Sequence, residues 1–508
     1  MSKGVATVAD GAKALRHYLD QLDSDQTVIV SQFLDGLTSR CVLPRDEKAA
    51  LKDDFVAALA YFASVRLPLG EAIARLSMTN LGGFYARSPK TWYRLDDAAK
   101  IYPVSMKHGH MEVFRLSMRL REPVVIPLLQ MALNFTIKRF PTFATCVKKG
   151  FFWHYLDASK RRYAIQPEVG LPCQPLAISG SNSPSFRVTY FHDRVSVEFF
   201  HILTDGAGGM TFLKALAATY LHLLIGSEGS DRDTEFGIVD INASPSAAEA
   251  ANEFPRADKT ATTSGFLDKI ATQMSGDLAL TSPCQILHFL IDASELKRAA
   301  KARSASITAY VLALMFLAGR HATEDLTGEI NIQVPVDMRK FYPSVTVRNF
   351  SMYCGVKLRL EEVTSVDAII GQIAEQLRRK GSKAMMSQML NSTLRIVRTV
   401  RYVPLFIKSP VARIVYGFLG DKVFSNTLSN LGVVQMPPEL ADHIRSFGFV
   451  LGGAQTNRAS CAMVTFNGRT VLSITKMTAD PSFEEELLAL LGRDNVTVRV
   501  EGSDLNAG

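Results

Sequence analysis

Residues 195–209 of the chain read VSVEFFHILTDGAGG, and much of the predicted fold is organised around this stretch. Its first residues alternate and then run continuously apolar, which is typical of a β-strand, and its glycines loosen the turn into a helix predicted over 210–224. His201 ends the strand, and Asp205 and Gly206 follow it. Because a strand end holds a side chain rigidly and an imidazole accepts a proton near neutral pH, we interpret His201 as a candidate general base.

The same residues also have a purely structural interpretation. A core histidine beside an aspartate that caps the next helix would give the same spacing. The pattern by itself leaves both interpretations open, so the rest of the chain has to distinguish them.

The composition predicts a large, folded and basic protein. The chain has 508 residues, is 47% hydrophobic and carries a formal net charge of +8. This length exceeds what one hydrophobic core usually supports, so we expect two core-bearing units. The positive charge favours nucleic acid, an anionic membrane surface or a phosphate-bearing substrate. Since the chain has no zinc-finger spacing, no RNA-binding aromatic signature and no basic repeat, we do not expect nucleic acid.

The spacing of cysteines and histidines indicates the cellular compartment of the protein and whether it binds a metal. The six cysteines are scattered without a paired spacing, which predicts reduced thiols in a cytoplasmic protein. The N-terminus lacks an apolar targeting core, and apolar runs such as 310–318 are shorter than a bilayer requires. His108-Gly109-His110 has a metal-like spacing, but two histidines one residue apart are more often part of an ordinary loop, so we assign no metal.

The order of patterns along the chain predicts its organisation. Residues 1–85 read as an N-terminal helical extension, and residues 86–260 as a first α/β half that contains the hairpin at 185–200. Residues 226–265 are rich in Ser, Ala, Asp and Glu, which is typical of a surface crossover. The second half is predicted over 261–508.

The second half repeats the hairpin of the first. Residues 461–475 form a predicted hairpin around Asn467-Gly468, a dipeptide that suits a type I′ turn. In an alignment of the two hairpins, Lys476 matches His201 and Asp480 matches Asp205, and a predicted helix follows both. The pattern therefore predicts two copies of one α/β unit, of which only the first kept the histidine.

Two further stretches carry positive charge. Arg339 is either a surface cation or a guanidinium that binds a buried carboxylate such as Asp205. Residues 376–420 contain no acidic residue, and their basic residues alternate with apolar ones. The alternatives for this stretch are a solvated helix face, a phosphate-binding wall or a peripheral contact with a membrane surface.

Three motifs together resemble a known superfamily. They are His201-x-x-x-Asp205-Gly206, then Pro335-Val336-Asp337-Met338-Arg339 with Asn349-Phe350, then Leu428-Ser429-Asn430-Leu431-Gly432. Over residues 92–491 the chain resembles the CoA-dependent acyltransferases, and most of all their alcohol acetyltransferase branch, with a similarity to wax ester synthases in the last motif. The resemblance implies two chloramphenicol-acetyltransferase-like α/β sandwich halves, arranged in a V with a tunnel between them.

The resemblance also implies roles for individual residues. His201 matches the general base, and Asp205 matches a structural aspartate that pairs with an arginine, for which Arg339 is the candidate. Gly206 would keep the turn compact, and either Ser429 or Asn430 would donate a hydrogen bond to the oxyanion. No cofactor is expected to be bound, and acyl-CoA would be a co-substrate.

The chain departs from the superfamily's pattern at two points. Many members have a second histidine just before the catalytic one, where this chain has Phe200. The Asp-Phe-Gly-Trp-Gly motif of the plant enzymes does not occur. The first departure leaves the matching base in place, and the second argues against the plant branch.

The predicted function is therefore acyl transfer from acyl-CoA to a small or lipid alcohol, or to an amine. Two alternatives stay open: a condensation-type reaction with an acyl-carrier protein as donor, and an inactive binding module of the same fold. The expected location is the cytoplasm, at a membrane surface if residues 376–420 bind lipid.

Overall fold

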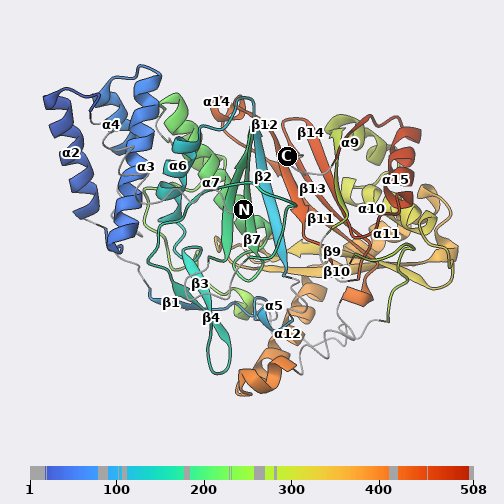
Figure 1. The fold of residues 1–508 in the computed structure, drawn as a ribbon. Helices are drawn as coiled ribbons and strands as arrows, with labels where there is room; N and C mark the ends of the chain where they lie inside the picture. The colour runs from blue at the N-terminus through green and yellow to red at the C-terminus, as the bar shows by residue number, and fades with distance from the viewer. Residues whose placement is uncertain are drawn as a thin grey trace.

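A computed structural model describes residues 18, 20–39, 41–77, 90–100, 102–105, 111–176, 184–227, 229, 231–256, 269–279, 283–410, 421–454 and 456–502. These residues form two α/β lobes that lie side by side, each built on its own β-sheet (Figure 1). Each lobe has its own apolar core, as the chain length predicts. His108 and His110 lie outside the described residues.

The first lobe is built on a five-stranded sheet. Helices α6 (Ile126–Ile137) and α7 (Gly206–Ile225) pack together in its core. Its strands are antiparallel except for the parallel pair β5 and β6. In spatial order they are β12 (Ile444–Leu451), β2 (Val113–Leu120), β7 (Arg194–Phe200), β6 (Phe186–Phe191) and β5 (Gln166–Pro167).

The second lobe is built on a seven-stranded sheet. In spatial order its strands are β10 (Ser351–Arg359), β9 (Glu329–Asp337), β11 (Asn426–Val434), β13 (Ala459–Phe466), β14 (Arg469–Lys476), β8 (Gln285–Asp292) and β15 (Val498–Glu501). Strand β11 is parallel to both of its neighbours. The helices of this lobe are α9 (Ala293–Ala302), α10 (Ile307–His321), α11 (Val366–Lys380), α12 (Lys383–Thr399) and α15 (Ser482–Arg493).

Strand β12 ties the lobes together. It comes from the predicted second half, 261–508, but it pairs antiparallel with β2 in the sheet of the first lobe. The predicted boundary at residue 260 therefore separates two stretches of sequence and does not separate the two sheets. The short helices α8 (Asp231–Glu235) and α14 (Pro438–Ala441) lie in connections.

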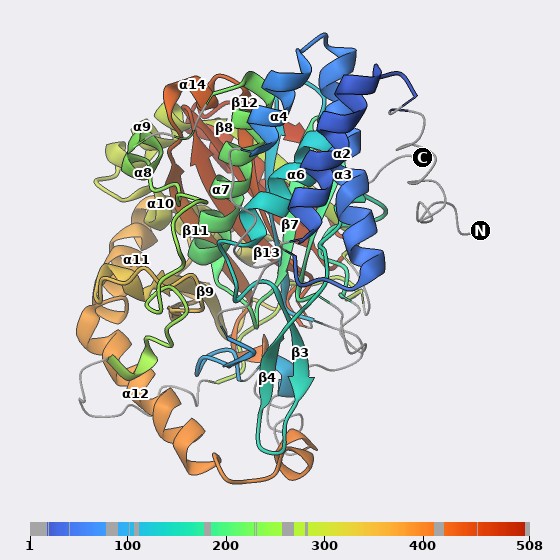
Figure 2. The same cartoon turned by 90° about the vertical axis from the view of Figure 1, so that its left-hand side faces the viewer.

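The N-terminal helices extend the first lobe. Helices α2 (Ser24–Ser39), α3 (Arg45–Ser64) and α4 (Leu69–Ser77) stand beside α6, as Figures 1 and 2 show. The ring of Phe55 lies 6.1 Å from that of Phe135 in α6, and the buried Asp54 carboxylate accepts a hydrogen bond from Arg162 at 2.6 Å. These helices therefore share the first lobe's core.

A small third sheet projects from the first lobe. It consists of β1 (Trp92–Arg94), β4 (His154–Ala158) and β3 (Thr145–Lys149), in that order. The turn between β3 and β4 points away from both main sheets (Figure 2).

Helix α7 is longer than the helix predicted over 210–224, and it is largely apolar. Within the described residues, Gly206–Ile225 is the single helix whose length and composition would let it cross a membrane. However, 78% of the most apolar 18-residue stretch of this helix is buried inside the protein. This apolar character is that of a core helix, because α7 packs against α6 and against β2 of the sheet.

The two predicted hairpins are present and have the same register. Phe191 pairs with Arg194 at the end of the first hairpin, and Phe466 pairs with Arg469 at the end of the second. Helix α7 follows the first and α15 follows the second. At the position that matches His201, Lys476 is 1% exposed and is bonded to the Glu484 carboxylate.

We expect Lys476→Met to destabilise the fold by about 3 kcal/mol, because it leaves the Glu484 carboxylate buried without its counterion. Burial already raises the pKa of Glu484. The loss should shrink as the pH falls, because protonation of Glu484 removes the uncompensated charge. Urea unfolding at several pH values measures it.

Two controls accompany this variant. Lys297→Met on the exposed face of α9 should change stability by less than about 0.5 kcal/mol. Glu484→Gln added to Lys476→Met should restore part of the loss. A deficit that stays constant with pH would contradict the buried ion pair as its cause.

Candidate active site

His201 lies in the turn between β7 and α7. Its backbone N–H donates to the Glu112 carbonyl at 2.7 Å. Its ring stacks on that of Tyr102, in α5 (Tyr102–Ser105), at a centroid distance of 4.8 Å, and meets the edge of Phe114 at 5.2 Å. The side chain is only partly buried. His201 is therefore held on two sides and is not enclosed in a dry core.

Asn349 sets the tautomer of His201. The Asn349 Nδ2 donates to the His201 carbonyl at 2.9 Å and to Asp96 Oδ2 at 3.3 Å, which turns Oδ1 toward the ring. That oxygen lies 2.9 Å from His201 Nδ1. Because an amide oxygen can only accept, Nδ1 carries the proton in the neutral ring and Nε2 keeps its lone pair.

Both oxygens of the Asp205 carboxylate accept structural hydrogen bonds. Oδ1 accepts from the Gly208 N–H at 2.9 Å and so caps helix α7. Oδ2 accepts from the Phe350 N–H at 2.7 Å and from Arg339 Nη1 at 2.9 Å. The expected pairing of Asp205 with Arg339 is present, and it joins the two lobes.

Arg339 is a bridge as well as a counterion. It lies in the short 3-10 turn Met338–Lys340 after β9, and its Nη2 donates to the Thr346 and Arg348 carbonyls at 2.9 and 2.7 Å. Burial alone would lower the pKa of Arg339, but Asp205 and Asp337 raise it above its usual value. The guanidinium therefore stays charged while it organises the loop 346–350.

Two glycines allow the second lobe to approach this turn closely. A side chain at Gly206 would come within 2.8 Å of Leu431 in β11. A side chain at Gly208 would overlap the Val347 carbonyl, the group to which the Thr204 hydroxyl donates at 2.6 Å. The sequence singled out Gly206, but Gly208 meets rigid backbone and is the more constrained position.

Ser429 and Asn430 lie on β11, next to Leu431. Asn430 Nδ2 donates to Thr308 at 3.1 Å, and its Oδ1 accepts from the Gly432 N–H at 2.8 Å, so this amide is used locally. The Ser429 side chain makes no hydrogen bond within the described residues. Neither residue bonds to His201 there, and the oxyanion role stays a prediction.

The sequence did not point to three residues of this site: Tyr102 and Phe114, which contact His201, and Asp96, which accepts a hydrogen bond from Asn349. Tyr102 and Phe114 contact the His201 ring with their own rings. Because both lie far from His201 in the chain, no spacing pattern in the sequence indicates these contacts. Asp96 is fully buried, and burial raises its pKa although Arg348 opposes the shift. Asn349 belonged to a quoted motif, but its contact with His201 becomes visible only when the lobes are placed.

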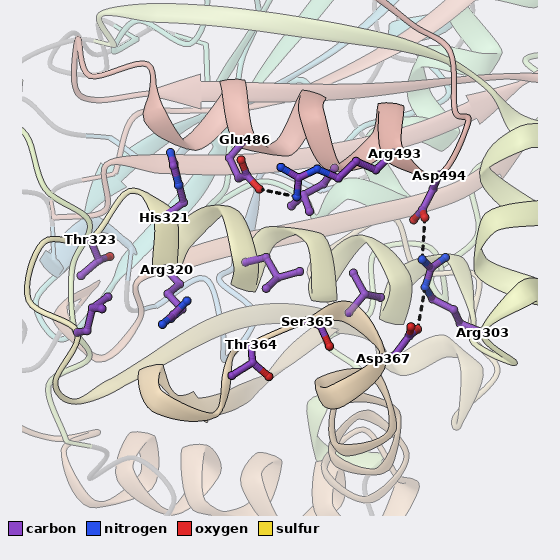
Figure 3. Close-up of a pocket in the computed structure, with 14 residues that line it drawn as sticks. Arg303, Arg320, His321, Thr323, Thr364, Ser365, Asp367, Glu486, Arg493 and Asp494 are labelled. Carbon is purple, nitrogen blue, oxygen red and sulfur yellow. Dashed lines mark hydrogen bonds and ion pairs between the residues drawn. The ribbon is translucent and has the colours of Figure 1, made fainter.

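A hollow of about 580 Å³ lies elsewhere, between α10, α11 and α15 of the second lobe (Figure 3). Its charges are largely paired, since Arg303 bridges Asp367 and Asp494, and Arg493 meets Glu486. It includes none of the residues around His201, so we do not regard it as the active site. Among the described residues no group of three or more acidic, His or Cys side chains could hold a metal ion.

The two-lobed structure has the CoA-dependent acyltransferase and condensation-domain fold. No protein-family model and no curated protein sequence matches the chain.

Solved structures show the likeness. TRI3 trichothecene 15-O-acetyltransferase from Fusarium sporotrichioides matches with a TM-score of 0.53 at 13% identity, over 79% of this chain and 94% of its own. F. sporotrichioides TRI101, solved with coenzyme A and T-2, matches with a TM-score of 0.53 at 12% identity, over 80% of this chain and 100% of its own. The first condensation domain of the CDA synthetase matches with a TM-score of 0.51 at 14% identity, over 80% of this chain and 95% of its own. These matches confirm the predicted fold class and, at the level of fold, the predicted resemblance to this superfamily.

We expect Gly208→Ala to lower the free energy of unfolding by about 2 kcal/mol, because the new methyl group overlaps a backbone oxygen of the other lobe. Gly371→Ala is the matched control. Gly371 is also a helical glycine, it has open space around it, and alanine there should add up to about 1 kcal/mol. Urea midpoints measure both, and an unchanged midpoint for Gly208→Ala would contradict the close approach of the lobes.

Proposed function

We propose that the protein transfers an acyl group from acyl-CoA to the hydroxyl of a small or lipid alcohol, with His201 as the general base. The hydrogen bond between His201 Nδ1 and Asn349 Oδ1 is the observation that carries this proposal. It directs the lone pair to Nε2, the atom that has to accept the proton. The fold shared with acetyltransferases supports acyl transfer as the reaction class.

In the proposed reaction the alcohol gives its proton to Nε2 while its oxygen attacks the thioester carbonyl carbon. The tetrahedral oxyanion then collapses and breaks the C–S bond. The departing thiolate of CoA takes the proton from the imidazolium, so the ester and free CoA leave and His201 is neutral again. An amine acceptor would react in the same way.

Each residue has a separate part in this scheme. Asn349 holds the ring orientation, and Asp205 with Arg339 holds the turn without touching the reacting atoms. Ser429 is our candidate donor to the oxyanion, since the Asn430 amide is bonded to Thr308. The substrates would meet at His201 in a tunnel between the lobes.

A carrier protein is the second candidate for the donor. The likeness to condensation domains and the net charge of +8, which suits an acidic partner, favour it. Transfer of one acyl group from acyl-CoA and from acyl-carrier protein, measured side by side, distinguishes the donors. If neither thioester is consumed, the protein is an inactive binding module of this fold.

We expect His201→Ala to reduce turnover at least about 100-fold, because the alcohol loses its proton acceptor. Release of free CoA thiol from acetyl-CoA in the presence of an alcohol measures it. His321→Ala, at the exposed end of α10, is the matched control and should retain full activity. Undiminished transfer by a folded His201→Ala protein would refute the base role.

We expect Asn349→Ala to lower kcat at least about tenfold with little change in KM, because both tautomers of His201 become populated and the ring loses its anchor. The pH profile of kcat should also broaden or shift, which a change confined to packing would not produce. Circular dichroism and the melting temperature establish whether the variant is folded. An unchanged kcat would remove Asn349 from the mechanism.

A further inference from the structure

A basic aromatic tip projects from one end of the molecule. We define it as the β3–β4 turn with Phe151 and Phe152, together with residues 395–408 at the end of α12 and just after it. In Figures 1 and 2 these two segments lie side by side, away from both main sheets. The turn belongs to the first lobe and residues 395–408 belong to the second.

Specific contacts hold the tip together. The Leu405 N–H donates to the Phe151 carbonyl at 2.8 Å, and the rings of Phe152 and Tyr402 meet edge to face at 6.2 Å. The Lys408 ammonium lies 3.2 Å from the centre of the Trp153 ring. The tip is therefore a built feature shared by both lobes.

Large apolar side chains on the tip face the solvent. Phe151 is 67% exposed, Tyr402 is 69% exposed and Phe406 is 70% exposed, and Ile396 and Ile407 are exposed beside them. Scattered exposed apolar residues are ordinary, but a contiguous group marks a surface that binds something apolar.

The same tip carries uncompensated positive charge. Arg395, Arg398 and Arg401 are exposed, and within the described residues none of them pairs with a carboxylate. The chain from 376 to 420 holds no acidic residue. An anionic surface would therefore meet no repulsion along this stretch.

We propose that the tip docks on an anionic lipid bilayer, with its aromatic and aliphatic side chains in the headgroup region and its arginines on lipid phosphates and carboxylates. The tip thus combines the two features that favour binding to an anionic membrane surface, exposed apolar side chains and positive charge. A projecting tip suits a flat, deformable surface, whereas a folded acidic protein would have to supply a matching hollow. The proposal concerns location and does not depend on the proposed function.

Flotation with vesicles tests the docking. The protein should float with vesicles that contain phosphatidylserine, remain behind with pure phosphatidylcholine, and detach at high salt. Arg398→Glu with Arg401→Glu should reduce the bound fraction about tenfold or more, and Phe151→Ser with Phe406→Ser should do the same.

Matched controls separate the tip from general charge and hydrophobicity. Lys297→Glu with Lys301→Glu reverses two exposed charges on α9, and Val169→Ser with Val345→Ser removes two exposed apolar side chains elsewhere. Both should bind vesicles as the parent protein does. Equal losses in the control and tip variants would overturn the proposal, as would an absence of binding at low salt. Tighter binding of an acidic carrier protein or RNA than of vesicles would also overturn it.

The tryptophans give an independent reading of the docked face. The chain has only two, Trp92 and Trp153, and both line a hollow of about 680 Å³ that shares Phe152 and Tyr402 with the tip. Brominated lipid in anionic vesicles should therefore quench the intrinsic fluorescence. Binding without quenching would place the contact on another face and refute the tip. Since neither readout uses turnover, failure here is distinguishable from failure of the acyl transfer proposal.

Discussion

The Asp205 carboxylate is the interaction on which the arrangement of the two lobes depends. One of its oxygens caps α7 in the first lobe, and the other binds Arg339 and the Phe350 N–H of the second. A buried carboxylate is costly unless its oxygens are hydrogen-bonded, and here both oxygens accept hydrogen bonds and one of them pairs with an arginine. A single group therefore fixes the start of a core helix and the docking of a loop from the other lobe.

The docked loop is what prepares the histidine. Two carbonyls of the loop 346–350 accept hydrogen bonds from Arg339. The same loop places Asn349 against His201 and Val347 against Thr204. The proposed base thus belongs to one lobe, and the amide that sets its tautomer belongs to the other. The proposed reaction would therefore need both lobes, although His201 itself belongs to the first.

Sequence patterns predicted the parts of this site that depend on local order. The hairpin, the turn and the helix around His201 follow from strand periodicity and glycine, and the Asp205 to Arg339 pair followed from a motif. The exchange of β12, the stacking of Tyr102 and the role of Asn349 were not predicted, because each depends on a contact between residues that are distant in the chain. The burial of α7 was not predicted for a related reason, since it depends on α6 and β2, which are distant from α7 in the chain.

A comparison with the second hairpin shows how the first one suits the proposed role of His201. At the matching position Lys476 is enclosed and bonded to Glu484, and the Asp480 side chain accepts from Ser482 at the start of α15. Both copies therefore keep an aspartate near the helix start and a polar residue at the strand end. They differ in what surrounds that residue: a carboxylate neutralises Lys476, whereas an amide orients His201 and leaves one nitrogen with its lone pair. The same local structure consequently buries an ion pair in one lobe and, in the other, holds the proposed base in contact with the opposite lobe.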